Sequence, residues 1–134
     1  MLPLRYAGWW SIVSLILLTF VLCLALMPAV LFWEDRYNAL SWLGEADKWL
    51  HGATFTMLTL WFVGQYSKRS YWKIGISLLA FGFVIEVCQR MVNYRTADMQ
   101  DVGADAMGII LGLIIGAAGC GGWCLKAEER LTKR

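Results

Sequence analysis

The sequence has little charge, a single histidine and only two prolines. Of its 134 residues 16% are charged, whereas about a quarter are charged in an average soluble domain. Hydrophobic residues make up 59% of the chain, and the mean hydropathy is +0.55. This composition indicates an integral membrane protein. The short length favours one domain, residues 1–134, without a separate soluble module.

Several familiar functional signatures are also missing. The four cysteines lie inside apolar runs rather than in loops, so we interpret them as packing residues and not as a disulfide framework. No glycine-rich phosphate loop follows a strand, and neither Ser41 nor Thr96 has an evident activating partner. Anionic lipid explains the basic residues better than nucleic acid does. The expected partners are therefore membrane lipids or a cell-wall lipid precursor, and no nucleic acid.

Four apolar runs are long enough to cross the ~30 Å hydrocarbon core of a bilayer. We expect transmembrane helices over about residues 8–33, 47–66, 72–92 and 101–125, hence an all-α, integral membrane four-helix bundle. Pro28 is expected to kink or end the first helix. The charged tail, residues 126–134, is expected to fray.

Lys and Arg are distributed unequally between the two ends of these helices. The end with both termini and the turn at residues 66–73 carries eight Lys and Arg against two Glu. The opposite end carries four Lys and Arg against eight Asp and Glu. Because basic residues favour the cytoplasmic side, we expect both termini to be cytoplasmic. The acidic end then faces the periplasm or the cell exterior.

Ionisable residues interrupt apolar sequence between residues 86 and 112. Charge at membrane depth is costly unless it is paired or hydrated, so function is expected there. A local ion pair between Glu86 and Arg90, four residues apart, is the structural alternative and stays open. Asp98, Asp101 and Asp105 follow at helical spacing and would repel one another unless cations, protons or a metal intervene. The cations for this role are Lys48, Arg90 and Arg95.

The glycines that follow, Gly108, Gly112 and Gly116, form a small-residue ladder, which we interpret as a helix-packing surface. Close packing there would bring His51 and Glu86 toward the aspartates. Histidine titrates near neutral pH and can move protons or bind metal. If a metal binds, an oxygen-preferring divalent cation fits best, with candidate ligands Asp98, Asp101, Asp105 and Glu86.

Three short motifs follow one another over residues 47–112. They read Asp47-Lys48-x2-His51-x3-Phe55-x2-Leu58, then Glu86-x2-Gln89, and then Arg95-x5-Asp101-Val102-x2-Asp105-x2-Gly108-x3-Gly112. Their combined spacing resembles the VanZ-like family of small bacterial membrane proteins. The chain departs from the commoner family pattern at Asp105, where that pattern has Asn. This extra carboxylate puts in doubt any role that needs a neutral amide at that position.

The resemblance implies a multi-pass protein of the bacterial inner (cytoplasmic) membrane. It carries over to seven positions of this chain: Lys48, His51, Glu86, Gln89, Arg95, Asp101 and Gly108. The founding member of the family is associated with resistance to the glycopeptide teicoplanin, so a link to antibiotic resistance is one expectation.

Three functions stay open at this stage. The first is an outward-facing pocket that recognises the headgroup of an envelope lipid or cell-wall precursor, with ligand-binding residues Lys48, Gln89, Arg90, Arg95, Asp98 and Asp105. The second is an enzyme acting on a lipid or polyprenyl headgroup, metal-assisted or not, with catalytic residues His51, Glu86 and Asp101. The third is a structural or assembly role in which the charges only hold helices together.

Overall fold

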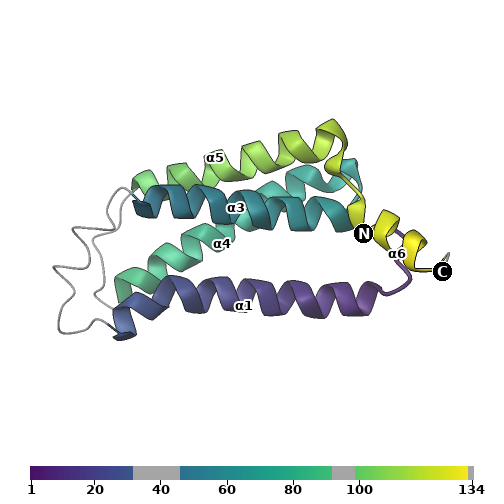
Figure 1. The fold of residues 1–134 in the computed structure, drawn as a ribbon. Helices are drawn as coiled ribbons and strands as arrows, with labels where there is room; N and C mark the ends of the chain where they lie inside the picture. Colours follow the sequence, from purple (N-terminus) through teal and green to yellow (C-terminus); the bar gives the residue numbers. More distant parts are fainter. Residues whose placement is uncertain (32–45, 92–98, 133–134) are drawn as a thin grey trace.

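The protein is all-α in the computed structural model, which describes residues 1–31, 46–91 and 99–132. Its α-helices are α1 (Ala7–Leu31), α3 (Ala46–Gln65), α4 (Tyr71–Met91), α5 (Met99–Ile115) and α6 (Trp123–Thr132). A short 3-10 turn, Lys68–Ser70, joins α3 to α4. Figure 1 shows the four long helices lying lengthwise in one bundle, with α6 at the end where both termini lie.

Three segments of the described chain are long and apolar enough to cross a membrane: Ala7–Leu26, Lys68–Met91 and Gln100–Cys120. They contain most of α1, α4 and α5. The length and composition of these helices indicate a membrane protein. Helix α3 has 20 residues but carries Asp47, Lys48 and His51 near its start and is not in this set. That all four long helices cross the bilayer stays a prediction.

The hydrophobic core lies between α3, α4 and α5. Its buried members are Phe55, Leu58 and Val63 from α3, Ile74, Leu78 and Ile85 from α4, and Ile109 from α5. Helix α1 adds partly buried leucines against this core from one side. Polar α3 is thus the central helix, covered by its more apolar neighbours.

Helices α3 and α5 make the most extensive helix pair of the described fold, along the glycines of α5. A Cβ added to Gly108 would lie 3.1 Å from the Gly52 Cα, and one added to Gly116 would lie 2.7 Å from Val63 Cγ2. Between them, a Cβ on Gly112 would lie 2.8 Å from Cγ2 of Thr59. The predicted role of these glycines as a packing surface is therefore confirmed, and we call this contact the glycine seam.

The fourth predicted helix is shorter than expected. Helix α5 ends at Ile115, and the chain then passes through a π turn, Gly116–Cys120. Gly119 and Gly122 have φ angles of 147° and 69°, which glycine tolerates because it has no Cβ. The continuous helix predicted to residue 125 is therefore wrong, and the tail that was expected to fray is helical as far as it is described, to Thr132. Residues 123–132 instead form α6.

Helix α6 is held against the start of the chain by Glu128. Its carboxylate accepts hydrogen bonds from the backbone N–H groups of Arg5 (2.7 Å) and Tyr6 (3.0 Å) and from Trp10 Nε1 (2.8 Å). Burial alone would raise the pKa of Glu128, but these hydrogen bonds and the Arg5 charge outweigh burial and lower the pKa below its usual range. The carboxylate also complements the positive end of the α1 dipole.

Aromatic rings fill the space beside Glu128. The ring centroid of Trp10 lies 5.6 Å from that of Trp61 and 5.7 Å from that of Trp123. Ser14 Oγ accepts hydrogen bonds from Trp61 Nε1 at 2.9 Å and from Gln65 Nε2 at 3.0 Å. We call this group the tryptophan cluster; it comprises Trp10, Ser14, Trp61, Gln65, Trp123 and Glu128.

Candidate functional site

Ionisable side chains gather at the end of the bundle opposite the termini. The start of α3, the end of α4 and the start of α5 all lie at this end (Figure 1). They contribute His51, Glu86, Asp101 and Asp105, which we call the acidic cluster. Residues far apart in sequence thus meet, as the glycine ladder predicts.

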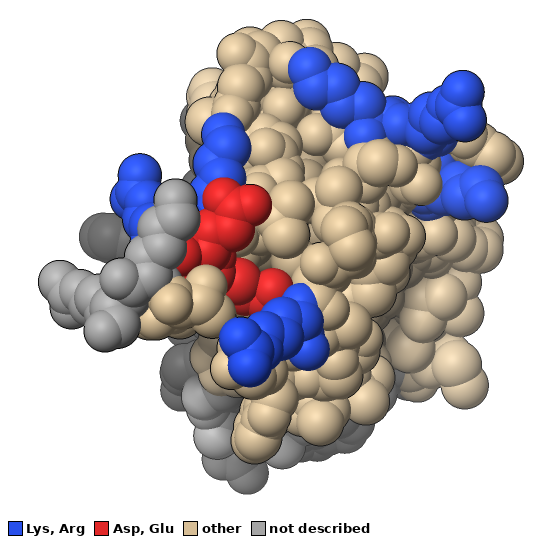
Figure 2. Space-filling view, turned by 90° about the vertical axis from the view of Figure 1, so that its right-hand side faces the viewer, with Lys and Arg blue, Asp and Glu red and all other residues tan. Residues whose placement is uncertain are grey.

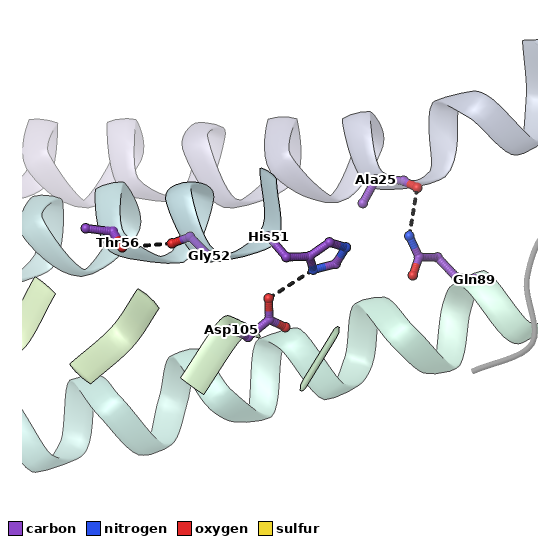
Figure 3. Close-up of polar contacts among 6 residues, drawn as sticks. All are labelled: Ala25, His51, Gly52, Thr56, Gln89 and Asp105. Atoms are coloured by element: carbon purple, nitrogen blue, oxygen red, sulfur yellow. Dashed lines mark hydrogen bonds and ion pairs between the residues drawn. The ribbon is translucent and has the colours of Figure 1, made fainter. Parts of the chain in front are cut away.

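The best-defined contact in the acidic cluster joins α3 to α5. His51 Nδ1 lies 2.9 Å from Asp105 Oδ1, and the two side chains are 12% and 3% exposed. Figure 3 shows the imidazole reaching across to Asp105, with its other ring nitrogen pointing away from that carboxylate. When Asp105 is ionised, Nδ1–H donates to it, which places the basic lone pair on Nε2.

Glu86 and Asp101 complete the cluster and are buried, as Asp105 is. Their exposed fractions are 5% and 1%. Both charges act on the His51 ring, together with that of Asp105. Three buried carboxylates therefore lie near enough to act on one imidazole, and Asp105 contacts it directly. Such an arrangement suits a positively charged group, because opposite charges attract strongly where little water screens them.

Two glycines make room for the pair of His51 and Asp105. Gly52 follows His51 and packs on Gly108 across the glycine seam. On the other side of Asp105, a Cβ added to Gly82 of α4 would lie 2.5 Å from Asp105 Oδ2. Asp105 is thus enclosed between α3 and α4, and its position depends on a bare backbone at Gly82.

A hydroxyl fixes the helix contact next to the cluster. Thr56 Oγ1 lies 2.7 Å from Gly52 O and 3.1 Å from Gly108 O, one carbonyl on each side of the seam. Figure 3 shows the contact with Gly52 one turn along α3 from His51. Sequence reasoning missed Thr56 and Gly82. The spacing of Gly82 four residues before Glu86, on the same face of α4, was the available signal.

The predicted ligand-binding residues that the structure describes differ in burial and in their contacts. Gln89 is buried, and its Nε2 donates to Ala25 O of α1 at 3.1 Å (Figure 3). Its Oε1 has no hydrogen-bond partner among the described residues. Lys48 donates to Gln100 Oε1 at the rim, and Arg90 is exposed.

Two predicted site residues, Arg95 and Asp98, lie outside the described residues. Within residues 1–31, 46–91 and 99–132, no group of three or more His, Cys, Asp or Glu side chains is arranged to hold a metal ion. The predicted metal set included Asp98, so its remaining members, Glu86, Asp101 and Asp105, are placed here only as an acidic cluster.

Comparison with known proteins identifies a family. No curated protein and no solved structure matches the chain. The sequence profile of the VanZ/LLP1 family matches residues 5–118, which include α1, α3, α4, α5 and the whole acidic cluster. The chain therefore belongs to the VanZ/LLP1 family.

Proposed function

We propose that this protein lies in the bacterial inner membrane and uses the acidic cluster to recognise the headgroup of an envelope lipid or cell-wall precursor. The observation that carries the proposal is the burial of Glu86, Asp101 and Asp105 around His51, at 5%, 1% and 2% exposure for the carboxylates. Charge-assisted hydrogen bonds to carboxylates are strong and directional. An amine or a sugar hydroxyl is the headgroup chemistry that this cluster complements.

Basic side chains at the same end complement the other half of such a headgroup. Lys48 is half-buried at the rim, and Arg90 is exposed on the last turn of α4. Both suit a phosphate or carboxylate that stays near water while the amine enters the acidic cluster. By sequence position Arg95 and Asp98 belong to the same ligand set.

Gln89 adds a second, independent argument for a ligand. Its side chain is 4% exposed, and Oε1 has no partner among the described residues. A buried amide oxygen without a partner costs stability, so a donor on the ligand would compensate for it. Gln89 lies one turn from Glu86 on the same face of α4, next to the acidic cluster.

Lipid co-purification tests this proposal. We expect Glu86→Gln to reduce bound amine-bearing lipid about tenfold, because it removes the acceptor charge of a charge-assisted hydrogen bond. Arg95→Ala should lower binding of phosphate-bearing lipids. The matched control is Glu129→Gln, which removes an exposed carboxylate from α6 at the opposite end. Lipid content equal to wild type in both site variants would refute recognition by this cluster.

A second function is favoured by the contact of His51 with Asp105. A carboxylate that holds Nδ1 orients the imidazole as a general base through Nε2. The candidate reaction is hydrolysis or transfer at a lipid or polyprenyl phosphate headgroup, in which Nε2 takes the proton of the attacking water or hydroxyl. Glu86 and Asp101 would stabilise the imidazolium that forms.

Turnover separates catalysis from binding. Purified protein is incubated with phospholipid and polyprenyl phosphate substrates, with and without chelator. His51→Gln should abolish product formation while the Glu86→Gln effect on binding stays measurable. If the substrates are recovered intact after incubation with wild-type protein, headgroup recognition without catalysis is the remaining function. Loss of activity with chelator would instead assign a divalent cation to the acidic cluster.

The family resemblance supplies the third element of the proposal, a role in glycopeptide resistance. Expression in a susceptible host should raise the inhibitory concentration of teicoplanin, and Glu86→Gln should remove that increase. An unchanged inhibitory concentration would show that this chain does not share the resistance role of the founding member. A purely structural or assembly role is distinguished by Glu86→Gln destabilising the fold.

A further inference from the structure

A cleft of about 410 Å³ opens between α1, α3 and α4 in the half of the bundle that holds the termini. Its walls are mostly apolar, with Leu18 from α1, Phe62 from α3, and Leu78 and Phe81 from α4. Small-molecule sites have volumes of a few hundred Å³ and apolar walls with few polar groups. The cleft therefore has the size and lining of a binding site, and its polar residues, Ser70, Lys73 and Ser77, lie toward the opposite end of α4 from Glu86.

The cleft is polar at one end and apolar at the other. Ser70, the last residue of the 3-10 turn, lines the cleft together with Lys73, Ser77 and Phe81, which follow at helical spacing on one face of α4. Lys73 and Phe81 are eight residues apart, or about 12 Å along the helix. The charged amine and the hydroxyls thus stand toward the start of α4, and the aromatic ring toward its middle.

The polar end of the cleft lies at headgroup depth in the expected bilayer. Exposed Trp72 stands beside Lys73, whose Nζ is 5.5 Å from the Trp72 ring centroid. Tyr66 also lines the cleft. Trp and Tyr are enriched at membrane interfaces, so this pair marks the interface on α3 and α4.

Basic side chains surround this end of the molecule. Figure 2 looks at it directly and shows groups of Lys and Arg around a small acidic patch. Arg69 and Lys73 are exposed on the turn and first residues of α4, and Lys68 donates to Ala117 O at 2.8 Å. Basic pockets between membrane helices attract anionic lipid headgroups.

We propose that this cleft binds an anionic glycerophospholipid of the surrounding leaflet. One acyl chain lies along the apolar wall formed by Leu18, Phe62 and Phe81, and the phosphate meets the Lys73 amine. The hydroxyls of Ser70 and Ser77 donate to phosphate and ester oxygens. Charge complementarity selects this occupant over a zwitterionic lipid, because the described residues that line the cleft include a cation, Lys73, and no carboxylate.

The test measures lipid preference with the full-length chain. Purified protein in detergent receives equal amounts of phosphatidylglycerol, phosphatidylethanolamine and phosphatidylcholine, and bound lipid is counted by native mass spectrometry. Wild type should prefer phosphatidylglycerol. Lys73→Gln should reduce this preference about fivefold, the effect of one basic residue at an anionic surface. The matched control, Lys126→Gln, removes an exposed charge on α6 outside the cleft and should keep it.

A second variant tests the apolar part of the site. Ser77→Trp places an indole in the cleft and should displace the acyl chain while circular dichroism shows an unchanged helix content. Equal binding of the three lipids by wild type, or an unchanged preference in both Lys73→Gln and Ser77→Trp, would overturn the proposal. Glu86→Gln should retain the phosphatidylglycerol preference, so failure of this site and failure of headgroup recognition at the acidic cluster are distinguishable.

Discussion

The two ends of the bundle bury polar groups in opposite ways. In the tryptophan cluster, Glu128 accepts three hydrogen bonds from neutral donors, two backbone N–H groups and one indole N–H. In the acidic cluster, Glu86, Asp101 and Asp105 are buried together with His51. The first end holds one carboxylate with three neutral donors, whereas the second brings three acidic side chains near one imidazole.

This difference separates a structural network from a candidate functional one. Hydrogen bonds from neutral donors to a carboxylate stabilise the folded chain, and Glu128 fixes α6 to the start of α1. The acidic cluster instead places three acidic side chains together in apolar surroundings. Ionisable groups at membrane depth are by default candidates for function. Both clusters depend on the same glycine seam, because α3 and α5 run through both ends.

The largest expected effect comes from closing that seam. Gly108→Ala places a Cβ 3.0 Å from the Gly52 carbonyl carbon and should destabilise the protein by about 1–3 kcal/mol through overpacking. Gly103→Ala is the matched control on α5, because nothing lies within 4 Å of its added Cβ. It should stabilise the helix by roughly 0.5–1 kcal/mol. Thermal unfolding in detergent, followed by circular dichroism, measures the stability of both variants. Equal unfolding midpoints would contradict close packing of α3 on α5 at the glycine seam.

The second effect breaks the tryptophan cluster alone. Glu128→Gln replaces a charged acceptor by a neutral one and should lower the thermal midpoint, because the N–H groups of Arg5, Tyr6 and Trp10 lose charge-assisted bonds. Glu129→Gln, on the exposed neighbour, should leave the midpoint unchanged. Binding at the acidic cluster should persist in both variants, and its loss in Glu128→Gln would show that the two ends are coupled.

The same carboxylate predicts a pH dependence. Hydrogen bonding and the Arg5 charge hold the pKa of Glu128 below its usual range despite burial. A lowered folded-state pKa contributes stability above the unfolded value of about 4.3, and this contribution is lost as pH falls through the folded pKa. The stability difference between wild type and Glu128→Gln should therefore be constant at neutral pH and shrink below about pH 4.3. A difference that grows in acid would contradict this account.

A third, smaller effect concerns the stability of the acidic cluster. Glu86→Gln removes one of three neighbouring acidic charges with little change in shape, so the thermal midpoint should fall less than in Glu128→Gln, whose carboxylate accepts three hydrogen bonds. The main expected loss is in lipid binding. A fall as large as that of Glu128→Gln would make the acidic cluster a second structural network.

The acidic cluster could be predicted from the sequence because its charged residues occur in otherwise apolar segments. Glu86, Asp101 and Asp105 stand at helical spacing in apolar sequence, and the glycines beside them predicted the close approach that brings His51 near. The contact of His51 with Asp105 could not be predicted, because it depends on the rotation of α3 against α5. Gly82 was missed since its role is to leave space for a residue of another helix.

The tryptophan cluster was not predicted at all. Its residues are ordinary for a membrane interface, where Trp and polar side chains are common. Glu128 lies 118 residues from Trp10, and only the break at Gly119 and Gly122 turns α6 back toward the start of the chain. A charged tail such as residues 126–134 has no intrinsic reason to be ordered, so fraying was the natural expectation. Tertiary contacts decided the outcome.

The smallest effect probes the geometry of the acidic cluster without changing its charge. In Gly82→Ala the added Cβ would lie 2.5 Å from Asp105 Oδ2 and 3.1 Å from Phe55 Cζ. Asp105 must then shift, and its contact with His51 lengthens. Headgroup binding should weaken roughly threefold, the order of effect for a distorted hydrogen bond.

Gly75→Ala is the matched control for Gly82→Ala on the same helix. Its added Cβ would meet side-chain atoms of Leu113 at 3.5 Å and Ile109 at 3.8 Å, which are ordinary contacts. Lipid titration followed by native mass spectrometry should therefore give wild-type affinity for this variant. If Gly82→Ala also binds as wild type while Glu86→Gln does not, the ligand depends on the charge of the acidic cluster and not on the pair of His51 and Asp105. That result would favour recognition of a headgroup over general-base catalysis, because only the latter needs an oriented imidazole.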